Sequence, residues 1–232
     1  MTIGIMGAMI EEIEPLLRFF KEYETVEFAD NKYYKTKYKN NDIVVAYSKI
    51  GKVFASLTAT TMIEKFGIKK LLFSGVAGAI DEDLHIGDLV IATKLCQHDL
   101  DITAFGHPYG YVPEGSVYIK SDKKLNDLAK EVAKEKGIKL KEGIVATGDQ
   151  FVADSKRKEW IRDTFKASAL EMEGASVAVV ANALNIPFLV LRAISDAADM
   201  DAGFDFDEFL KSSAVNSANF IISILDKMIE KS

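Results

Sequence analysis

The chain has 232 residues, of which 48% are hydrophobic and 28% are charged, and its formal net charge at pH 7 is −6. This composition is that of an ordinary globular protein and excludes a disordered or low-complexity scaffold. The acidic balance argues against a nucleic-acid partner, because affinity for a phosphate backbone rests largely on lysine and arginine. Cys96 is the only cysteine, so no intrachain disulfide and no thiolate metal cluster can form, which suits a cytoplasmic protein.

Short apolar runs rich in β-branched residues alternate along the chain with longer segments of helical period. The short runs predict strands at 2–6, 43–47, 70–73, 88–93, 143–146 and 188–192. The longer segments predict helices at 53–66, 123–136, 156–164, 174–184 and 207–231. This alternation predicts a single α/β domain over residues 1–232, with a mixed, mainly parallel central β-sheet flanked by α-helices.

Neither the N-terminus nor the longest apolar stretch favours contact with a membrane. No basic segment precedes the first apolar run, so Thr2 to Met9 predicts a strand and not a secretory signal. The stretch from Ala175 to Ile194 is interrupted by two asparagines and a proline, which is typical of a helix, a turn and a strand.

The least regular stretch runs from Gln97 to Ser116. Long ordered loops of this kind tend to be lids or contact surfaces, and we expect an interface role. The pattern His98-Asp99-Leu100-Asp101 within it superficially suggests a metal site. With three histidines and one cysteine in the chain there is no second ligand cluster, so we expect no metal and interpret the pattern as loop hydrogen bonding.

Four predicted strands end in short segments that could carry chemistry, because ligands in open α/β sheets bind beyond the carboxyl ends of strands. The first strand leads into Glu12, an acid in a first helical turn. Such acids also stabilise helices through the macrodipole alone, so both roles stay open. The strand at 70–73 leads into Gly75 and Gly78, which would let a flat ligand approach the backbone or would simply form a tight turn.

Each of the remaining segments allows both a purely structural and a functional interpretation. Phe151 follows the strand at 143–146 and could stack on a base or pack in the core. Glu171 and Glu173 flank a methionine and could bind sugar hydroxyls or act as first-turn acids. Asp196 could be an N-cap, yet paired with Glu12 it could also serve as one of two carboxylates whose pKa values are driven apart.

Together and in this order, these motifs resemble the 5'-methylthioadenosine/S-adenosylhomocysteine nucleosidases of the nucleoside phosphorylase superfamily. The family pattern Gly-x-x-Gly-Ala-Met-x-x-Glu is met by Gly4 to Glu12, Glu-Met-Glu by Glu171 to Glu173, and Arg-x-Ile-Ser-Asp by Arg192 to Asp196. The likeness extends almost from Thr2 to the terminal helix. It implies a nucleoside phosphorylase-like fold with no cofactor.

The resemblance also implies a role for each matching residue. Glu12 would activate water, Asp196 would protonate adenine with Ser195 as its positioning neighbour, and Glu173 would bind the ribose. The further substrate contacts that it implies are Met9, Ile50, Val76, Ala77, Gly78, Phe151, Val152, Met172, Arg192 and Phe206.

Members of this family are homodimers in which a loop with the pattern His-Asp-x-Asp-x-Thr-Ala-Phe closes the neighbour's site. Residues 98–105 match this pattern, so Phe105 and Pro113 are expected to reach the second subunit's site. Val76 stands where many relatives carry serine. With the run from Tyr47 to Val53, this resembles the branch that also hydrolyses 6-amino-6-deoxyfutalosine in menaquinone synthesis.

The expected activity is hydrolysis of the N-glycosidic bond of 5'-modified adenine nucleosides: 5'-methylthioadenosine, S-adenosylhomocysteine, 5'-deoxyadenosine and 6-amino-6-deoxyfutalosine. The pathways implied are methionine salvage and menaquinone biosynthesis. One alternative is a phosphate-dependent nucleoside phosphorylase, which Glu12 disfavours because a carboxylate in the nucleophile's place repels phosphate. The other is a purine-nucleoside-binding protein without turnover, which the presence of both carboxylates disfavours.

Overall fold

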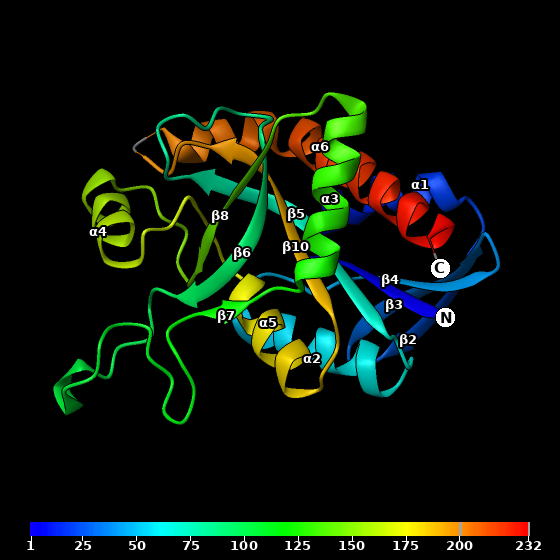
Figure 1. The fold of residues 1–232 in the computed structure, drawn as a ribbon, viewed down its shortest axis with the longest axis horizontal. Coiled ribbons are helices and arrows are strands. Elements are labelled where there is room, and N and C mark those ends of the chain that lie inside the picture. The colour runs from blue at the N-terminus through cyan, green and yellow to red at the C-terminus, as the bar shows by residue number, and fades with distance from the viewer. Residues whose placement is uncertain (200, 232) are drawn as a thin grey trace.

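The architecture is a mixed β-sheet with helices on both of its faces, in a computed structural model that describes residues 1–199 and 201–231 (Figure 1). The strands are β1 (Thr2–Gly7), β2 (Glu24–Phe28), β3 (Asn31–Tyr38), β4 (Asn41–Tyr47), β5 (Lys70–Ala79), β6 (Leu89–Gln97), β7 (Ile119–Lys120), β8 (Leu140–Thr147), β9 (Ala169–Glu171) and β10 (Phe188–Asp196). The helices are α1 (Ile10–Phe20), α2 (Lys52–Glu64), α3 (Lys123–Lys136), α4 (Ser155–Phe165), α5 (Gly174–Ala183) and α6 (Ala202–Glu230), and Thr103–Phe105 forms a 3-10 turn.

The strand order is β10-β6-β8-β9-β5-β1-β4-β3-β2, and β10 also pairs with β5. The pairings of β5, β10, β6, β8 and β9 therefore close into a ring, from which β1, β4, β3 and β2 extend. Strands β4, β1, β5 and β10 are mutually parallel where they pair. Their carboxyl ends consequently meet at one edge, which is where ligands bind in sheets of this kind.

The hydrophobic core has one layer on each face of the sheet and a third cluster that packs against α4. Strand β1 is buried on both faces, and its alternating side chains feed both layers: Ile3 and Ile5 pack with α1, α3 and α6, whereas Met6 packs on the side of α2 and α5. A continuous apolar run is what a doubly covered parallel strand requires. Within residues 1–199 and 201–231, no helix is long and apolar enough to cross a membrane.

The predicted fold class is confirmed, and each predicted strand and helix is present. Strand β5 extends to Ala79, well past its predicted end at 73, so Gly75 and Gly78 lie within the strand and not in a turn after it. The hairpin of β2 and β3 was not predicted, because β2 is almost wholly exposed and carries no apolar run. Together with the short strands β7 and β9, this hairpin makes the sheet less parallel than the sequence suggests. Helix α6 begins at Ala202, five residues before its predicted start at 207 (207 − 202 = 5).

Helix α6 offers a test of the core layer that it forms with the sheet. Ile221 is fully buried there, whereas Val215 on the same helix is 37% exposed. We expect Ile221→Ala to lower the free energy of unfolding by about 2–5 kcal/mol, because it leaves a cavity in a packed core. Val215→Ala is expected to change it by less than about 0.5 kcal/mol. Urea denaturation at one protein concentration measures both, and equal effects would contradict this packing.

Candidate active site

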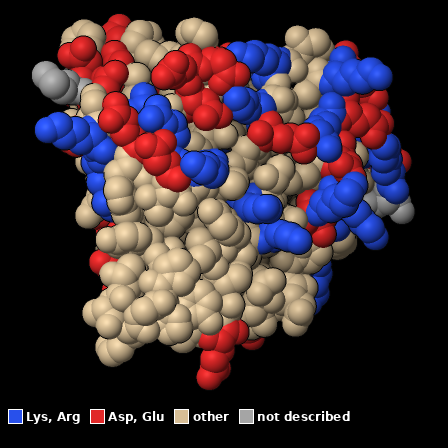
Figure 2. Space-filling view, turned by 60° about the vertical axis from the view of Figure 1, so that its left-hand side comes forward, with Lys and Arg blue, Asp and Glu red and all other residues tan. Residues whose placement is uncertain are grey.

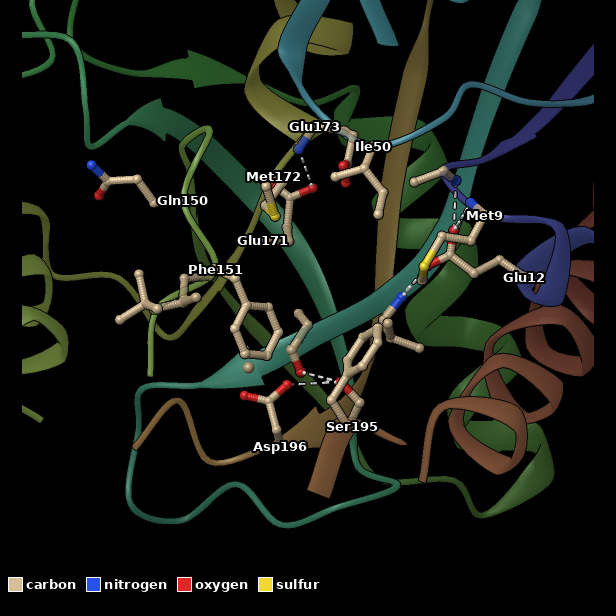
Figure 3. A pocket seen from close by; sticks show the side chains of 17 residues that line it. Met9, Glu12, Ile50, Gln150, Phe151, Glu171, Met172, Glu173, Ser195 and Asp196 are labelled. Carbon is tan, nitrogen blue, oxygen red and sulfur yellow. Dashed lines mark hydrogen bonds between the residues drawn. The ribbon is translucent and has the colours of Figure 1, made fainter. Parts of the chain in front are cut away.

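A cavity of about 270 Å³ lies at the carboxyl ends of the parallel strands (Figure 3). The predicted site residues that line it are Met9, Glu12, Ile50, Val76, Ala77, Gly78, Phe151, Val152, Met172, Glu173, Ser195, Asp196 and Phe206. Figure 3 shows Glu12 and Asp196 on separate sides of this space, with Met172 and Glu173 along a third. The fold thus brings residues from seven separate parts of the chain around one cavity.

Glu12 lies in the first turn of α1, and its carboxylate is almost wholly buried. One oxygen accepts hydrogen bonds from the backbone N–H groups of Ala8 (2.5 Å) and Met9 (3.0 Å), and the other accepts from the N–H of Val76 (2.9 Å). Burial raises the pKa of Glu12, while the Arg192 guanidinium and these N–H groups act in the opposite direction. The carboxylate therefore caps its own helix and also faces the cavity.

The two glycines at the end of β5 leave room for the carboxylates. A Cβ atom on Gly75 would lie 2.7 Å from Glu12 Oε1, and one on Gly78 would lie 2.7 Å from Asp196 Oδ1. Neither contact is compatible with a side chain at these positions. The spacing Gly-x-x-Gly is thus explained by the close approach of two acidic side chains to one strand.

Asp196 ends strand β10 and is 4% exposed. Its Oδ2 accepts a hydrogen bond from the Ser195 hydroxyl (2.9 Å), and its Oδ1 accepts from the Ala198 N–H (2.9 Å). Burial raises the pKa of Asp196 in spite of these two donors. The carboxyl group is consequently suited to hold a proton that it can give to a ligand.

Glu171 is the centre of the polar contacts behind the cavity. It accepts hydrogen bonds from Arg192 Nη2 (2.7 Å), from the Gly174 N–H (2.7 Å) and from the Thr147 hydroxyl. Burial and the neighbouring Glu171 carboxylate raise the pKa of Glu173, which accepts a hydrogen bond from the Gly51 N–H (2.9 Å). Both carboxylates line the cavity, but Glu171 is the more fully bound to protein groups, whereas Glu173 accepts one hydrogen bond from the Gly51 N–H.

Arg192 does not line the cavity, which corrects its predicted place among the substrate contacts. Its side chain is 1% exposed and forms an ion pair with Glu171 at 2.7 Å. The guanidinium also lies 4.1 Å from the centre of the Phe73 ring. Arg192 thus acts on the site through its charge and through Glu171.

Apolar side chains form the rest of the wall. Phe151 is 48% exposed and packs edge-on against Phe206, with ring centres 5.6 Å apart. This placement rules out the core-packing alternative for Phe151, because one ring face remains available to a flat ligand. Ile50 is 54% exposed and lies at the mouth of the cavity.

Phe105 and Pro113 lie outside this cavity, in the long loop that projects away from the sheet in Figure 1. Phe105 is 80% exposed, so its ring contacts little within its own chain. The expectation that both residues serve a second subunit's site stays a prediction.

Sequence analysis assigned no role to three of the lining residues: Ala8, Gln150 and Leu170. Each is adjacent in the chain to a residue that was singled out, so adjacency was the one available signal. Glu171, which the sequence offered with Glu173 as a possible sugar ligand, also lines the cavity. In residues 1–199 and 201–231 no group of three histidine, cysteine or acidic side chains is placed to hold a metal ion.

The arrangement combines an acid and a base across an apolar space. Asp196 can hold a proton on one side, and Glu12 is fixed by three N–H groups on another. None of the lining residues that the structure describes is a lysine or an arginine. Such a site can protonate a leaving group and orient water, and it offers no cation to an anionic nucleophile.

Comparison with known proteins places this cavity in context. The chain is 58% identical over 228 residues to an aminodeoxyfutalosine nucleosidase from Campylobacter jejuni, covering 98% of this chain and 100% of that relative. It is 37% identical over 230 residues to a 5'-methylthioadenosine/S-adenosylhomocysteine nucleosidase from Bacillus thuringiensis, covering 98% and 100%.

A solved structure is also similar over nearly its whole length. It is that of a mutant nucleosidase of the 5'-methylthioadenosine/S-adenosylhomocysteine type from Helicobacter pylori with 5'-methylthioadenosine in the active site, and it matches with a TM-score of 0.97 at 52% identity, covering 97% of this chain and 98% of that one. A family model matches residues 2–229, and the chain belongs to the family that this model describes, the phosphorylase superfamily.

Proposed function

We propose that this protein hydrolyses the N-glycosidic bond of 5'-modified adenine nucleosides and releases adenine and the 5'-modified ribose. The observation that carries the proposal is the charge of the cavity wall. Glu12, Glu173 and Asp196 line it, and no lysine or arginine does so in residues 1–199 and 201–231. A site of this kind suits a neutral nucleoside and a water nucleophile.

The proposed roles follow from the positions of the three carboxyl groups. Adenine is a poor leaving group as an anion, so a proton from Asp196 lowers the barrier to bond cleavage. Positive charge then grows on the ribose, and a water oriented by Glu12 attacks from the opposite face, as in inverting glycoside hydrolysis. Glu173 accepts hydrogen bonds from the ribose hydroxyls.

A phosphorylase mechanism is the runner-up within the same superfamily. Its nucleophile is phosphate, which needs cationic or N–H donors at the attacking position. In this structure the N–H groups of Ala8, Met9 and Val76 are already taken by Glu12. The Glu12 carboxylate in their midst would repel a phosphate, so water is the favoured nucleophile.

The 5' side of the proposed substrate is accommodated by an apolar and partly open wall. Met9, Ile50, Met172 and Phe206 contribute to it. Relatives named aminodeoxyfutalosine nucleosidase match at 58% and 53% identity, against 37% for one named for methylthioadenosine and adenosylhomocysteine. These values support 6-amino-6-deoxyfutalosine as a substrate beside 5'-methylthioadenosine. With these substrates, the proposed roles are in menaquinone biosynthesis and methionine salvage, and the proposed compartment is the cytoplasm.

A second copy of the chain is proposed to cover the uncharged face formed by residues 53–63, 102–113 and 174–187. These segments contain no lysine, arginine, aspartate or glutamate. Figure 2 shows the lower part of that view largely free of charged side chains, at the height where Figure 1 has α2, α5 and the long loop. Val53 and Phe105 are 76% and 80% exposed there. A large exposed apolar patch marks an interaction site, and a homodimer would cover it.

Glu12 is tested by substitution with its amide. Glu12→Gln keeps the shape but removes the base, so we expect turnover of 5'-methylthioadenosine and of 6-amino-6-deoxyfutalosine to fall about 10²- to 10⁴-fold. Adenine release is measured with and without phosphate. Glu11→Gln, one residue earlier and outside the cavity wall, should keep wild-type turnover. A sugar 1-phosphate product that depends on phosphate would contradict hydrolysis.

The role of Asp196 as the acid predicts how turnover falls at high pH. Its proton is needed for reaction and its pKa is raised, so turnover should fall as the pH rises through that raised value. Asp196→Asn should lower turnover about 10²-fold or more and remove this alkaline limb of the pH profile. Asp199→Asn, in the segment that follows, should retain it. An unchanged profile in Asp196→Asn would reject the role of Asp196 as the acid.

The dimer is tested at its exposed face. Val53→Glu places a charge on an exposed side chain, so the fold should be kept while the dimer dissociates. Sedimentation equilibrium is expected to give the mass of a monomer. Adenine release by this variant should be at least about tenfold slower than in the wild type, because in the proposed dimer a loop from the second subunit completes each site. Val215→Glu on α6 is the control and should remain dimeric. A fully active wild-type monomer would refute the arrangement.

A further inference from the structure

A polar network lies beside the cavity, outside the residues that line it. The Lys52 ammonium forms an ion pair with Asp99 Oδ1 at 2.7 Å and donates a hydrogen bond to Gln97 Oε1 at 3.2 Å. The two charged side chains are only 18% and 14% exposed. Pairs that are largely withdrawn from water are much less screened than surface pairs, so their geometry matters more.

Asp99 and Asp149 join this ion pair to the loop after β8. The second oxygen of Asp99 accepts a hydrogen bond from the Asp149 N–H (2.8 Å), and Asp149 Oδ1 accepts from the Lys52 N–H (2.8 Å). Three segments distant in sequence are thereby linked in a closed cycle: the start of α2, the residues after β6 and the residues after β8. We call Lys52, Asp99 and Asp149 the Asp99 network.

The network contacts both halves of the proposed substrate site through neighbouring residues. Gly51 directly precedes Lys52, and its N–H donates to the Glu173 carboxylate on the ribose side at 2.9 Å. Asp149 directly precedes Gln150 and Phe151, which line the cavity on the base side. Gly51 has a φ of +100°, and a Cβ atom there would lie 3.1 Å from Asp149 Oδ1. The turn thus directs the Gly51 N–H to Glu173 on the ribose side and the Lys52 N–H to Asp149 next to the base side.

We propose that the Asp99 network is a positioning device that holds the ribose-binding and base-binding segments at a fixed separation and ties both to the long loop that begins at His98. This inference rests on the proposed function, because it assigns the two segments to ribose and base. Lys52, Asp99 and Asp149 are not among the residues that line the cavity. They act by fixing Glu173 and Phe151, and a displacement of about 1 Å in such groups costs up to about 10²-fold in rate.

The experiment compares Asp99→Asn with Asp127→Asn. Asp127 forms ion pairs with Lys123 and Lys130 on α3 and does not line the cavity, so it is a matched lysine–aspartate pair away from the site. We expect Asp99→Asn to weaken adenine binding and to raise KM for 5'-methylthioadenosine, each by about tenfold, with a smaller change in kcat. The pH limb set by Asp196 should not move. Asp127→Asn should match the wild type in adenine affinity and in KM.

A second pair of variants separates positioning from folding. Lys52→Arg keeps the cation and should restore most of the affinity that Lys52→Met loses. In the double variant of Asp99→Asn and Asp149→Asn, the losses should be smaller than the product of the single losses, because both disrupt one unit. Wild-type adenine affinity in Asp99→Asn, or strictly multiplicative losses, would overturn the proposal. Adenine affinity is measured independently of catalysis. If the wild type binds adenine but hydrolyses no nucleoside, the proposed function is refuted, while the positioning role of the Asp99 network can still be tested by adenine binding.

Discussion

The Arg192 guanidinium lies buried among carboxylates that outnumber it. It pairs directly with Glu171 and lowers the cost of ionising Glu12 and Glu173 through space. One cation cannot neutralise three buried anions, and an unpaired buried charge is expensive. The cluster therefore favours retention of protons, and burial raises the pKa values of Glu12 and Glu173. The proposed acid, Asp196, lies outside this cluster, and its own burial raises its pKa.

The raised pKa values of the buried carboxyl groups link stability to pH. A carboxyl group with a raised pKa in the folded protein binds its proton more tightly there than in the unfolded chain. Its contribution to stability is therefore present at low pH and is lost as the pH rises through the raised value. Glu12, Glu173 and Asp196 all belong to this class. The site is consequently a place where stability is given up for reactivity, as is common in enzymes.

The sequence predicted the strands and helices well because their apolar periodicity is local. The hairpin of β2 and β3 escaped because an exposed, charged strand has no such period. In the site, Glu12 and Asp196 were identified from ordered motifs, whereas the reason for Gly75 and Gly78 was not visible. Their lack of a side chain makes sense only once carboxylates from α1 and β10 are seen against β5.

The sequence also could not predict which polar residues distant in the chain would pair with each other. Arg192 and Glu171 are 21 residues apart, and Lys52 and Asp99 are 47 apart. No spacing rule connects residues that meet only through the sheet order. The motif pattern placed Arg192 near the site, but which carboxylate it would bind depended on how β9 and β10 lie around the ring of strands.

That ring also orders the events of folding. Strand β10 pairs with both β5 and β6, so the ring closes only when the last strand of the chain is in place. During synthesis Glu12 emerges early, but its counterpart Asp196 and the cover from Phe206 follow more than 180 residues later (196 − 12 = 184). Contacts of such sequence separation are slow to form. A growing chain therefore has no competent cavity, and the nucleoside can stabilise only the finished protein, through its preferential binding to the folded state.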